Sequence, residues 1–187
     1  MLIPVFTEHS GGYTSRTKAN ALWSDVTIAF AVDFSTGGER NTAKYAGEKL
    51  VKIQIPRNLG MLSQDEYEDF VSVVSQRISL HITTITSDTP IKINIAGNRL
   101  AIFHSHSISQ GTLDKLVYEV IKAVVAGKCD KFIIRSGGQS GADEAGIKAA
   151  MRLGLSCSVL APKGWKFSEE TGKEIENEEL FKSRFKI

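Results

Sequence analysis

A glycine-rich segment, Ser136-Gly137-Gly138-Gln139-Ser140-Gly141-Ala142-Asp143, follows a short apolar run and precedes a stretch with helical spacing. Its glycines would let the backbone approach a ligand closely. The free amides at the start of the following helix, together with the helix dipole, favour an anion such as phosphate. Asp143 would either cap those amides or bind a ribose hydroxyl or a base edge. The competing interpretation is a tight turn, capped by Ser140, that holds no ligand.

A second glycine turn, Ser35-Thr36-Gly37-Gly38, follows another apolar run and opens a second helix, which contains Thr42. In an open α/β sheet, ligands bind beyond the carboxyl ends of the strands, where the topology reverses. Two such turns on one edge form a crevice that can hold both ends of a nucleotide. The pair of turns therefore predicts a nucleotide site, with phosphate on the amides of residues 137–141 and 35–38.

Lys163 follows the strand predicted over Ser156–Leu160 and would lie at the same edge, where its charge could neutralise a phosphate. Taken alone, this residue is explained as well by a solvated lysine in a turn beside Trp165. The sequence leaves the two interpretations open.

Two histidines, His104 and His106, end the strand predicted over Leu100–Phe103, and on a strand they would point the same way. A metal ion would need a third ligand, for which His9 and His81 are the candidates. We interpret the pair as polar residues that contact a ligand at the strand end, and we expect no metal site.

Strands and helices alternate in two runs. The first has a strand over Val26–Val32, a helix from about Arg40 to Glu48 and a strand over Leu50–Ile55. The second has a strand over Leu100–Phe103, a helix over Thr112–Ala126, a strand over Lys131–Arg135, a helix over Gly141–Leu153 and a strand over Ser156–Leu160. This alternation is typical of parallel βαβ units. It predicts an α/β fold: a Rossmann-like open, mainly parallel sheet with helices on both faces.

The middle of the chain departs from this alternation. A capping box at Ser63–Glu66 predicts a helix. Residues 81–95 alternate in hydropathy around a break at Ser87–Pro90, as in a β-hairpin. We therefore predict that residues 58–98 form an insertion or an edge extension, a helix plus a hairpin, within a single domain over 1–187.

The tail has a second capping box, Thr171–Glu174, which predicts a helix. The six glutamates of residues 169–179 would form its solvated face. Phe181 and Phe185, four residues apart, would dock its end on the core or on a second subunit, so a homo-oligomer stays open.

Composition limits the class of protein. The chain has 187 residues, 42% hydrophobic, with a formal net charge of +2. No apolar run reaches the roughly 18 residues of a membrane span, and the first residues lack the pattern of a signal peptide. Near-neutral charge argues against a protein held on nucleic acid by a phosphate-binding face. Cys129 and Cys157 fit neither a disulfide framework nor a metal knuckle, and burial as small apolar residues is expected. We expect a cytoplasmic domain that handles a small molecule.

The first glycine segment, together with Ala161-Pro162-Lys163-Gly164, resembles the SLOG superfamily of Rossmann-like domains. The most similar branch is the one described as molybdenum carriers, whose motif Gly-Gly-Gln-Thr-Gly-Val-Asp is followed, after a strand, by Pro-Lys-Gly. The order of pieces differs, because the elements that match the family's later part come first here: Tyr13, Arg16 and Asn20, then Asp25, the Val26–Val32 strand and Ser35–Gly38. The chain thus resembles a circular permutation, which implies that residues 171–185 pack near residues 1–25.

The resemblance implies a ligand-binding, sensing or sequestering protein whose two glycine loops hold a nucleotide or nucleotide-like ligand. Lys163 and Arg16 would supply positive charge, and Asp143 and Gln139 would orient the sugar or base. One alternative is a LOG-like hydrolase of an N-glycosidic or phosphate bond, with Asp143, Glu144 or Glu39 as acid or base. LOG hydrolases carry a glutamate three residues after the motif threonine, a position that Tyr45 occupies here. Another alternative is a carrier of the molybdenum cofactor.

Overall fold

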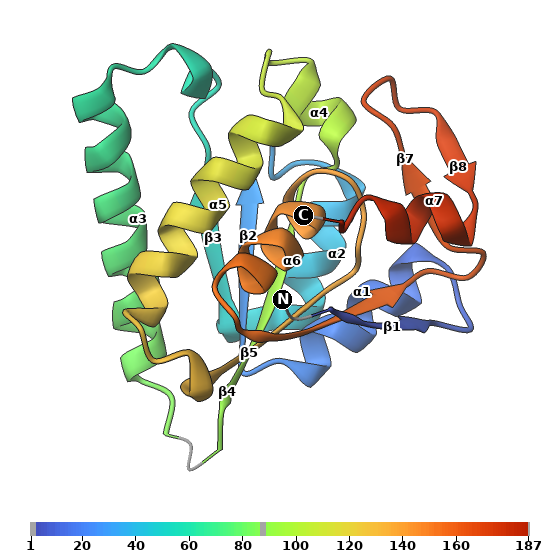
Figure 1. Cartoon of the computed structure of the whole chain (residues 1–187), viewed down its shortest axis with the longest axis horizontal. Helices are drawn as coiled ribbons and strands as arrows, with labels where there is room; N and C mark the ends of the chain where they lie inside the picture. Colours follow the sequence, from blue (N-terminus) through green and yellow to red (C-terminus); the bar gives the residue numbers. More distant parts are fainter. Residues whose placement is uncertain (1–2, 87–88, 187) are drawn as a thin grey trace.

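A computed structural model describes residues 3–86 and 89–186. Six strands form one sheet in the order β1-β6-β5-β4-β2-β3, and every neighbouring pair is parallel (Figure 1). The strands are β1 (Val5–Glu8), β2 (Val26–Ala31), β3 (Leu50–Gln54), β4 (Ile91–Gly97), β5 (Phe132–Ser136) and β6 (Ser156–Ala161). The predicted α/β fold with an open, Rossmann-like parallel sheet is confirmed.

Helices cover both faces of the sheet (Figure 1). On one face α1 (Tyr13–Trp23) packs against α2 (Gly37–Ala46), and on the other α5 (Gln110–Val125) lies between α3 (Gln64–Thr83) and α6 (Ala142–Arg152). Short elements complete the chain: α4 (Leu100–His104), α7 (Glu178–Ser183), the antiparallel pair β7 (Lys166–Ser168) and β8 (Glu174–Glu176), and 3₁₀ turns at Gly47–Lys49, Leu59–Met61 and Cys129–Lys131.

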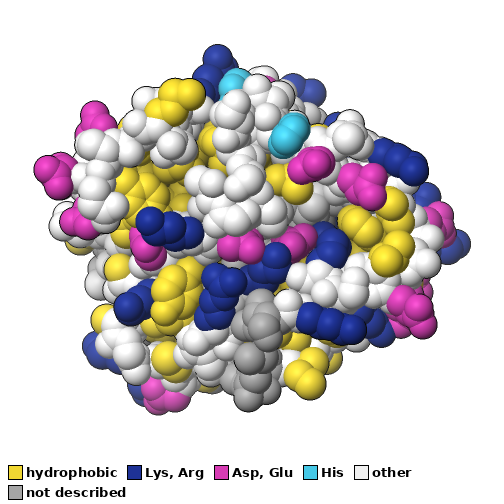
Figure 2. Space-filling model, turned by 45° about the horizontal axis from the view of Figure 1, so that its top comes forward, with side chains coloured by type: hydrophobic (Ala, Val, Ile, Leu, Met, Phe, Trp, Pro, Cys, Tyr) yellow, Lys and Arg dark blue, Asp and Glu magenta, His cyan; other side chains and the backbone are white. Residues whose placement is uncertain are grey.

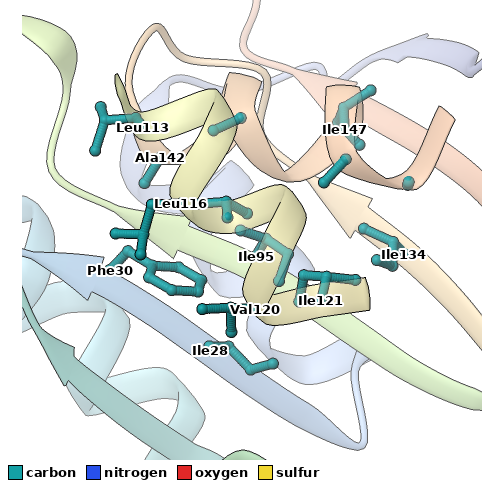
Figure 3. Packing of buried hydrophobic residues seen from close by; sticks show 14 of the residues in the cluster. Ile28, Phe30, Ile95, Leu113, Leu116, Val120, Ile121, Ile134, Ala142 and Ile147 are labelled. Atoms are coloured by element: carbon teal, nitrogen blue, oxygen red, sulfur yellow. The ribbon is translucent and has the colours of Figure 1, made fainter. Parts of the chain in front are cut away.

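The core lies between the sheet and α5 and α6. All six residues of β2 are buried, as expected for a central strand covered on both faces. Figure 3 shows Leu116, Val120 and Ile121 of α5 directed at the isoleucines of the central strands. Helix α6 approaches β4 closely because Gly146 has no side chain; a Cβ there would lie 2.5 Å from Ile95.

The direction of the chain reverses between β2 and β4. From β2 the chain runs outward through α2 to the edge strand β3, whereas from β4 it runs the other way, through α5 and α6, to β5 and β6. The segments that leave β2 and β4 therefore diverge to opposite faces of the sheet. Such a reversal opens a crevice at the carboxyl ends of the two strands.

Two elements predicted for the middle of the chain are wrong. Leu100–Phe103 forms part of helix α4 rather than a strand. An apolar run of this length fits either conformation, and in the helix the Phe103 side chain is still buried in the core. The hairpin over 81–95 is absent from the described part of that range: residues 81–83 end α3, and Ile91–Gly97 forms the central strand β4, between β2 and β5. Ser87 and Asp88, in the predicted break, lie outside the described residues.

The capping box at Ser63 is confirmed, since the Ser63 side chain and Glu66 bond each other's backbone at the start of α3. The capping box at Thr171–Glu174 is not formed. Gly172 adopts a left-handed φ of 86° in the turn of the β7–β8 hairpin, and the helix begins later, where Asn177 caps α7. Alternation of glutamate with Ile175, which packs on the core, fits a strand better than a helix.

Phe181 and Phe185 are buried in the core, so they anchor the tail to this chain itself. The tail also packs near the start of the chain, as expected: Tyr13 Oη donates to Glu174 Oε2 over 2.9 Å, and the rings of Phe6 and Phe185 lie 5.6 Å apart. The circular permutation itself stays a prediction.

Among residues 3–86 and 89–186, none of the helices has the length and apolar character needed to cross a bilayer. On the face shown in Figure 2, lysine and arginine side chains are interspersed with acidic ones.

Candidate functional site

A cavity of about 350 Å³ opens at the carboxyl ends of β2, β4 and β5, between α1, α2 and the first glycine loop. Its volume is at the lower end of the range for small-molecule sites. Eight of the predicted site residues line it, from segments up to 127 positions apart: Arg16, Thr36, Gly37, Gly38, Thr42, Gly137, Gln139 and Asp143. The two glycine loops thus share one cavity at the reversal of the chain.

The other predicted residues lie outside the cavity lining. Ser35 is exposed, and Ser136 is buried in β5. Gly138 packs against Phe181, where a Cβ would lie 2.4 Å from the ring. Lys163 is exposed and its backbone N–H donates to Gly11 O at 3.1 Å, so its loop is tied to the start of α1.

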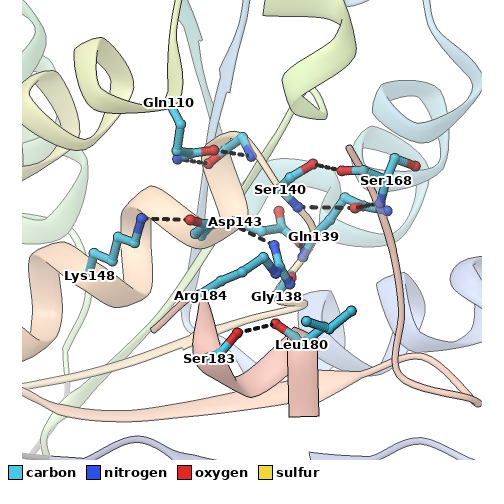
Figure 4. Close-up of polar contacts among 12 residues, drawn as sticks. Gln110, Gly138, Gln139, Ser140, Asp143, Lys148, Ser168, Leu180, Ser183 and Arg184 are labelled. Atoms are coloured by element: carbon cyan, nitrogen blue, oxygen red, sulfur yellow. Dashed lines mark hydrogen bonds and ion pairs between the residues drawn. The ribbon is translucent and has the colours of Figure 1, made fainter. Parts of the chain in front are cut away.

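Ser140 and Gly141 are also outside the lining, because side chains of the protein hold this loop. Gly141 N–H donates to Gln110 Oε1 at 2.7 Å, and the Ser140 hydroxyl donates to Ser168 O (Figure 4). Ser140 N–H donates to Gln139 Oε1, which also accepts from Ser168 N–H. Gln139 N–H donates to Asp143 Oδ2 at 3.4 Å. The amides of residues 139–141, expected to bind phosphate, are therefore already used within the protein.

The second loop is built differently. Thr36 caps α2 by accepting from Glu39 N–H at 3.3 Å, and the helix begins at Gly37. As the first two helical residues, Gly37 and Gly38 have amides that no preceding turn can use. Neither has a left-handed φ; a Cβ on Gly38 would meet nothing within 4 Å, and one on Gly37 would meet only Arg40, at 4.0 Å. Neither conformation nor packing requires glycine here, and both glycines are exposed and line the cavity.

Glu39 follows these glycines and turns into the protein. It is 4% exposed; Oε1 accepts from Asn98 Nδ2 at 3.4 Å, whereas Oε2 is buried without a partner among the described residues. Burial raises the pKa of Glu39 to about 7, and the nearby charge of Asp143 adds to the shift. A carboxyl group that titrates near neutrality lies at the wall of the cavity.

Asp143 and Arg16 form a buried ion pair across the cavity. Arg16 Nη1 lies 3.4 Å from Asp143 Oδ2 and donates to Gly137 O at 2.7 Å. Burial raises the pKa of Asp143, and the Arg16 guanidinium opposes that shift. Gly137 is required by this contact, since a Cβ there would lie 2.0 Å from Arg16 Nη1. The pair fixes α1 against the first glycine loop.

Asn98, which directly follows β4, was missed by the sequence analysis. Its Oδ1 accepts from the N–H groups of Val32 and Asp33, each at 3.0 Å, and its Nδ2 donates to Asp33 O and to Glu39. Asn98 thus joins the ends of β2 and β4 and positions Glu39. The pair Gly97-Asn98 directly follows a β-branched run and could have indicated a polar residue at the end of a central strand. We did not consider it, because we interpreted that run as one arm of a hairpin.

His104 lies on α4, exposed, with Nδ1 3.8 Å from Glu170 Oε2, so the two histidines do not end a strand. In the described part of the chain, no group of three or more histidine, cysteine or acidic side chains could hold a metal ion. Cys157 is buried, and burial raises the pKa of its thiol to about 11; Cys129 is half-buried.

Comparison of the chain with models of protein families, with curated proteins and with solved structures found no match.

Proposed function

We propose that the protein binds a nucleotide or a nucleotide-derived ligand in this cavity, as a ligand-binding, sensing or sequestering protein. The observation that supports this best is the start of α2: two adjacent glycines in the first turn of a helix line a cavity at the reversal of the sheet, with no packing reason to be glycine. Backbone amides at a helix start, with the dipole behind them, favour an anion. We place the phosphate there rather than on the amides of residues 139–141.

The rest of the ligand would extend toward the first glycine loop. Gln139 and Asp143 line that wall, and Tyr13 lies beside them, held by its hydrogen bond to Glu174. The ring of Tyr13 offers a flat surface on which a nucleobase can stack. Nη1 of Arg16 is committed to Asp143 and Gly137, so this end of the guanidinium contributes charge to the wall rather than a free donor.

Replacing Gly38 with alanine tests the phosphate position. We expect affinity for nucleoside monophosphates to fall at least tenfold, because the methyl group occupies the space beside the amides. Stability should stay equal or rise by about 0.4–1 kcal/mol, since alanine fits helical φ and restricts the unfolded chain. Calorimetric titration and thermal melting measure the two effects.

Gly111→Ala is the matched control. Gly111 also lies in the first turn of a helix, α5, and a Cβ there would meet only the Ser109 hydroxyl, at 3.8 Å. It should show the same small effect on stability and unchanged affinity. Equal affinity of Gly38→Ala and the wild type would refute the phosphate position. A panel of nucleotides that leaves the melting temperature unchanged would refute the function.

A second function, hydrolysis of the ligand at an N-glycosidic or phosphate bond, is favoured by Glu39. A carboxyl group with a pKa of about 7 can exchange a proton at physiological pH. Glu39→Gln should then lower release of base or phosphate from nucleoside monophosphates by about 10²–10⁴-fold while binding persists. Recovery of intact ligand from the wild type would leave binding as the function.

A further inference from the structure

Three buried polar atoms of the cavity lining have no hydrogen-bond partner among the described residues: Arg16 Nε, Asn20 Oδ1 and Glu39 Oε2. Their residues are only 8%, 4% and 4% exposed. A buried polar atom without a partner is unfavourable, and such atoms are rare in folded proteins. All three border the same cavity, so one small ligand can satisfy them together.

The three atoms come from adjacent surfaces. Arg16 and Asn20 are four residues apart on α1, so their side chains lie on the same face of that helix. Glu39 is in the first turn of α2, which packs against α1, and Asn98 fixes its other carboxylate oxygen. Glu39 also follows the open amides of Gly37 and Gly38 directly. A group bound to these atoms therefore lies next to the proposed phosphate.

The set consists of one donor, Arg16 Nε, and two acceptors, Asn20 Oδ1 and ionised Glu39 Oε2. A second anion would be repelled by Glu39 and Asp143, and an apolar group would leave all three atoms unpaired. Vicinal hydroxyl groups fit the set, because each hydroxyl donates one hydrogen bond and also accepts. A base edge with an acceptor beside its N–H donors would pair the same atoms. In a nucleotide, however, the sugar and not the base is bonded to the phosphate, which we place at Gly37 and Gly38, directly before Glu39.

Resting on the proposed function, we infer that this part of the cavity recognises the vicinal hydroxyls of a ribose, with the hydroxyls donating to Asn20 and Glu39 and accepting from Arg16. The ligand class is thus a ribonucleotide, oriented with its phosphate on α2 and its sugar between α1 and α2. A 2′-deoxyribonucleotide is discriminated against, because it leaves one buried atom unpaired.

The test is calorimetric titration with the four ribonucleoside monophosphates and their 2′-deoxy counterparts. For the nucleobase with the highest affinity, we expect the ribonucleotide to bind at least tenfold more tightly than the 2′-deoxyribonucleotide. In Asn20→Leu, a near-isosteric change, this ratio should fall toward one, whereas Asn58→Leu, at an exposed position outside the lining, should keep it.

The stability of Asn20→Leu is a second measurement, and it should change in the direction opposite to the affinity. Because the change removes an unpaired buried oxygen, the melting temperature should rise by about 2–4 °C while ribonucleotide affinity falls. If the ribo and deoxy forms bind equally and Gly38→Ala still weakens their binding, this inference is overturned and the proposed function is kept. A ribo preference that persists in Asn20→Leu would also overturn the inference. Absence of binding by every nucleotide would overturn both.

Discussion

Replacing Arg16 with methionine is expected to lower the free energy of unfolding by about 3–5 kcal/mol, the cost of leaving one member of a buried ion pair alone. Arg16 and Asp143 have side chains 9% and 8% exposed, and Arg16 also bonds the carbonyl of Gly137. Methionine fills similar volume but removes the charged partner of Asp143 and the donor to Gly137 O, and leaves Asp143 with its backbone hydrogen bond from Gln139. Chemical denaturation at pH 7 measures the change.

Two controls separate this effect from the loss of any charged residue. Lys166 pairs with Glu174 and Glu176 at 3.6 and 3.5 Å on the surface, so Lys166→Met should change stability by less than about 1 kcal/mol. Adding Asp143→Asn to Arg16→Met should recover part of the loss, because the unpaired charge is then removed. An Arg16→Met protein as stable as the wild type would show that the pair does not fix α1 to the glycine loop.

Replacing Glu39 with glutamine is expected to stabilise the protein at pH 8 by up to about 3 kcal/mol and to change little near pH 4.5. In the folded protein the pKa of Glu39 is raised from 4.5 to about 7, mainly by burial. Between these values the folded state holds a proton that the unfolded state has released, so the stability of the wild type falls as pH rises. Glutamine cannot ionise and should not show that fall.

Denaturation of both proteins from pH 4.5 to 8 gives the comparison, in the absence of added ligand. Glu48→Gln, at an exposed glutamate in the 3₁₀ turn that follows α2, is the matched control and should follow the wild type throughout. A constant difference between Glu39→Gln and the wild type across this range would contradict a carboxyl group that titrates in the cavity.

The glycine loops and most βαβ elements were predictable because their signals are local. Val26–Ala31 is apolar apart from Thr27, which is typical of a strand covered on both faces, and α5 has apolar residues at helical spacing. The loops between these elements then fall at the carboxyl edge of the sheet. Eight of the fourteen residues expected at the site therefore line one cavity.

Strand β4 was not predictable in the same way. Its Ile93 is placed between Val26 and Ile134, which are 67 and 41 residues away in the chain. A strand with such distant partners has the same local alternation as one arm of a hairpin. With β4 misplaced, Asn98 and its contacts to Glu39 could not be foreseen.

The state of the glycine-loop amides depends on distant partners as well. Gly141 N–H donates to the side chain of Gln110, 31 residues earlier, and the Ser140 hydroxyl donates to the carbonyl oxygen of Ser168, 28 residues later. No spacing rule within the loop reveals these acceptors. Only the three-dimensional structure shows these bonds, and because of them we propose the second of the two expected anion positions, the start of α2.

Backbone amide NMR with a titrated ribonucleoside monophosphate tests the central claim most directly, since it reports which amides a ligand reaches. We expect the largest chemical-shift changes at the amides of Gly37 and Gly38 and smaller ones at Asn98 and Gln139. The amide of Gly141 should change little, because it is already bonded to Gln110. Saturable binding with shifts centred on Ser140 and Gly141, or confined to the surface between β3 and α3, would contradict it.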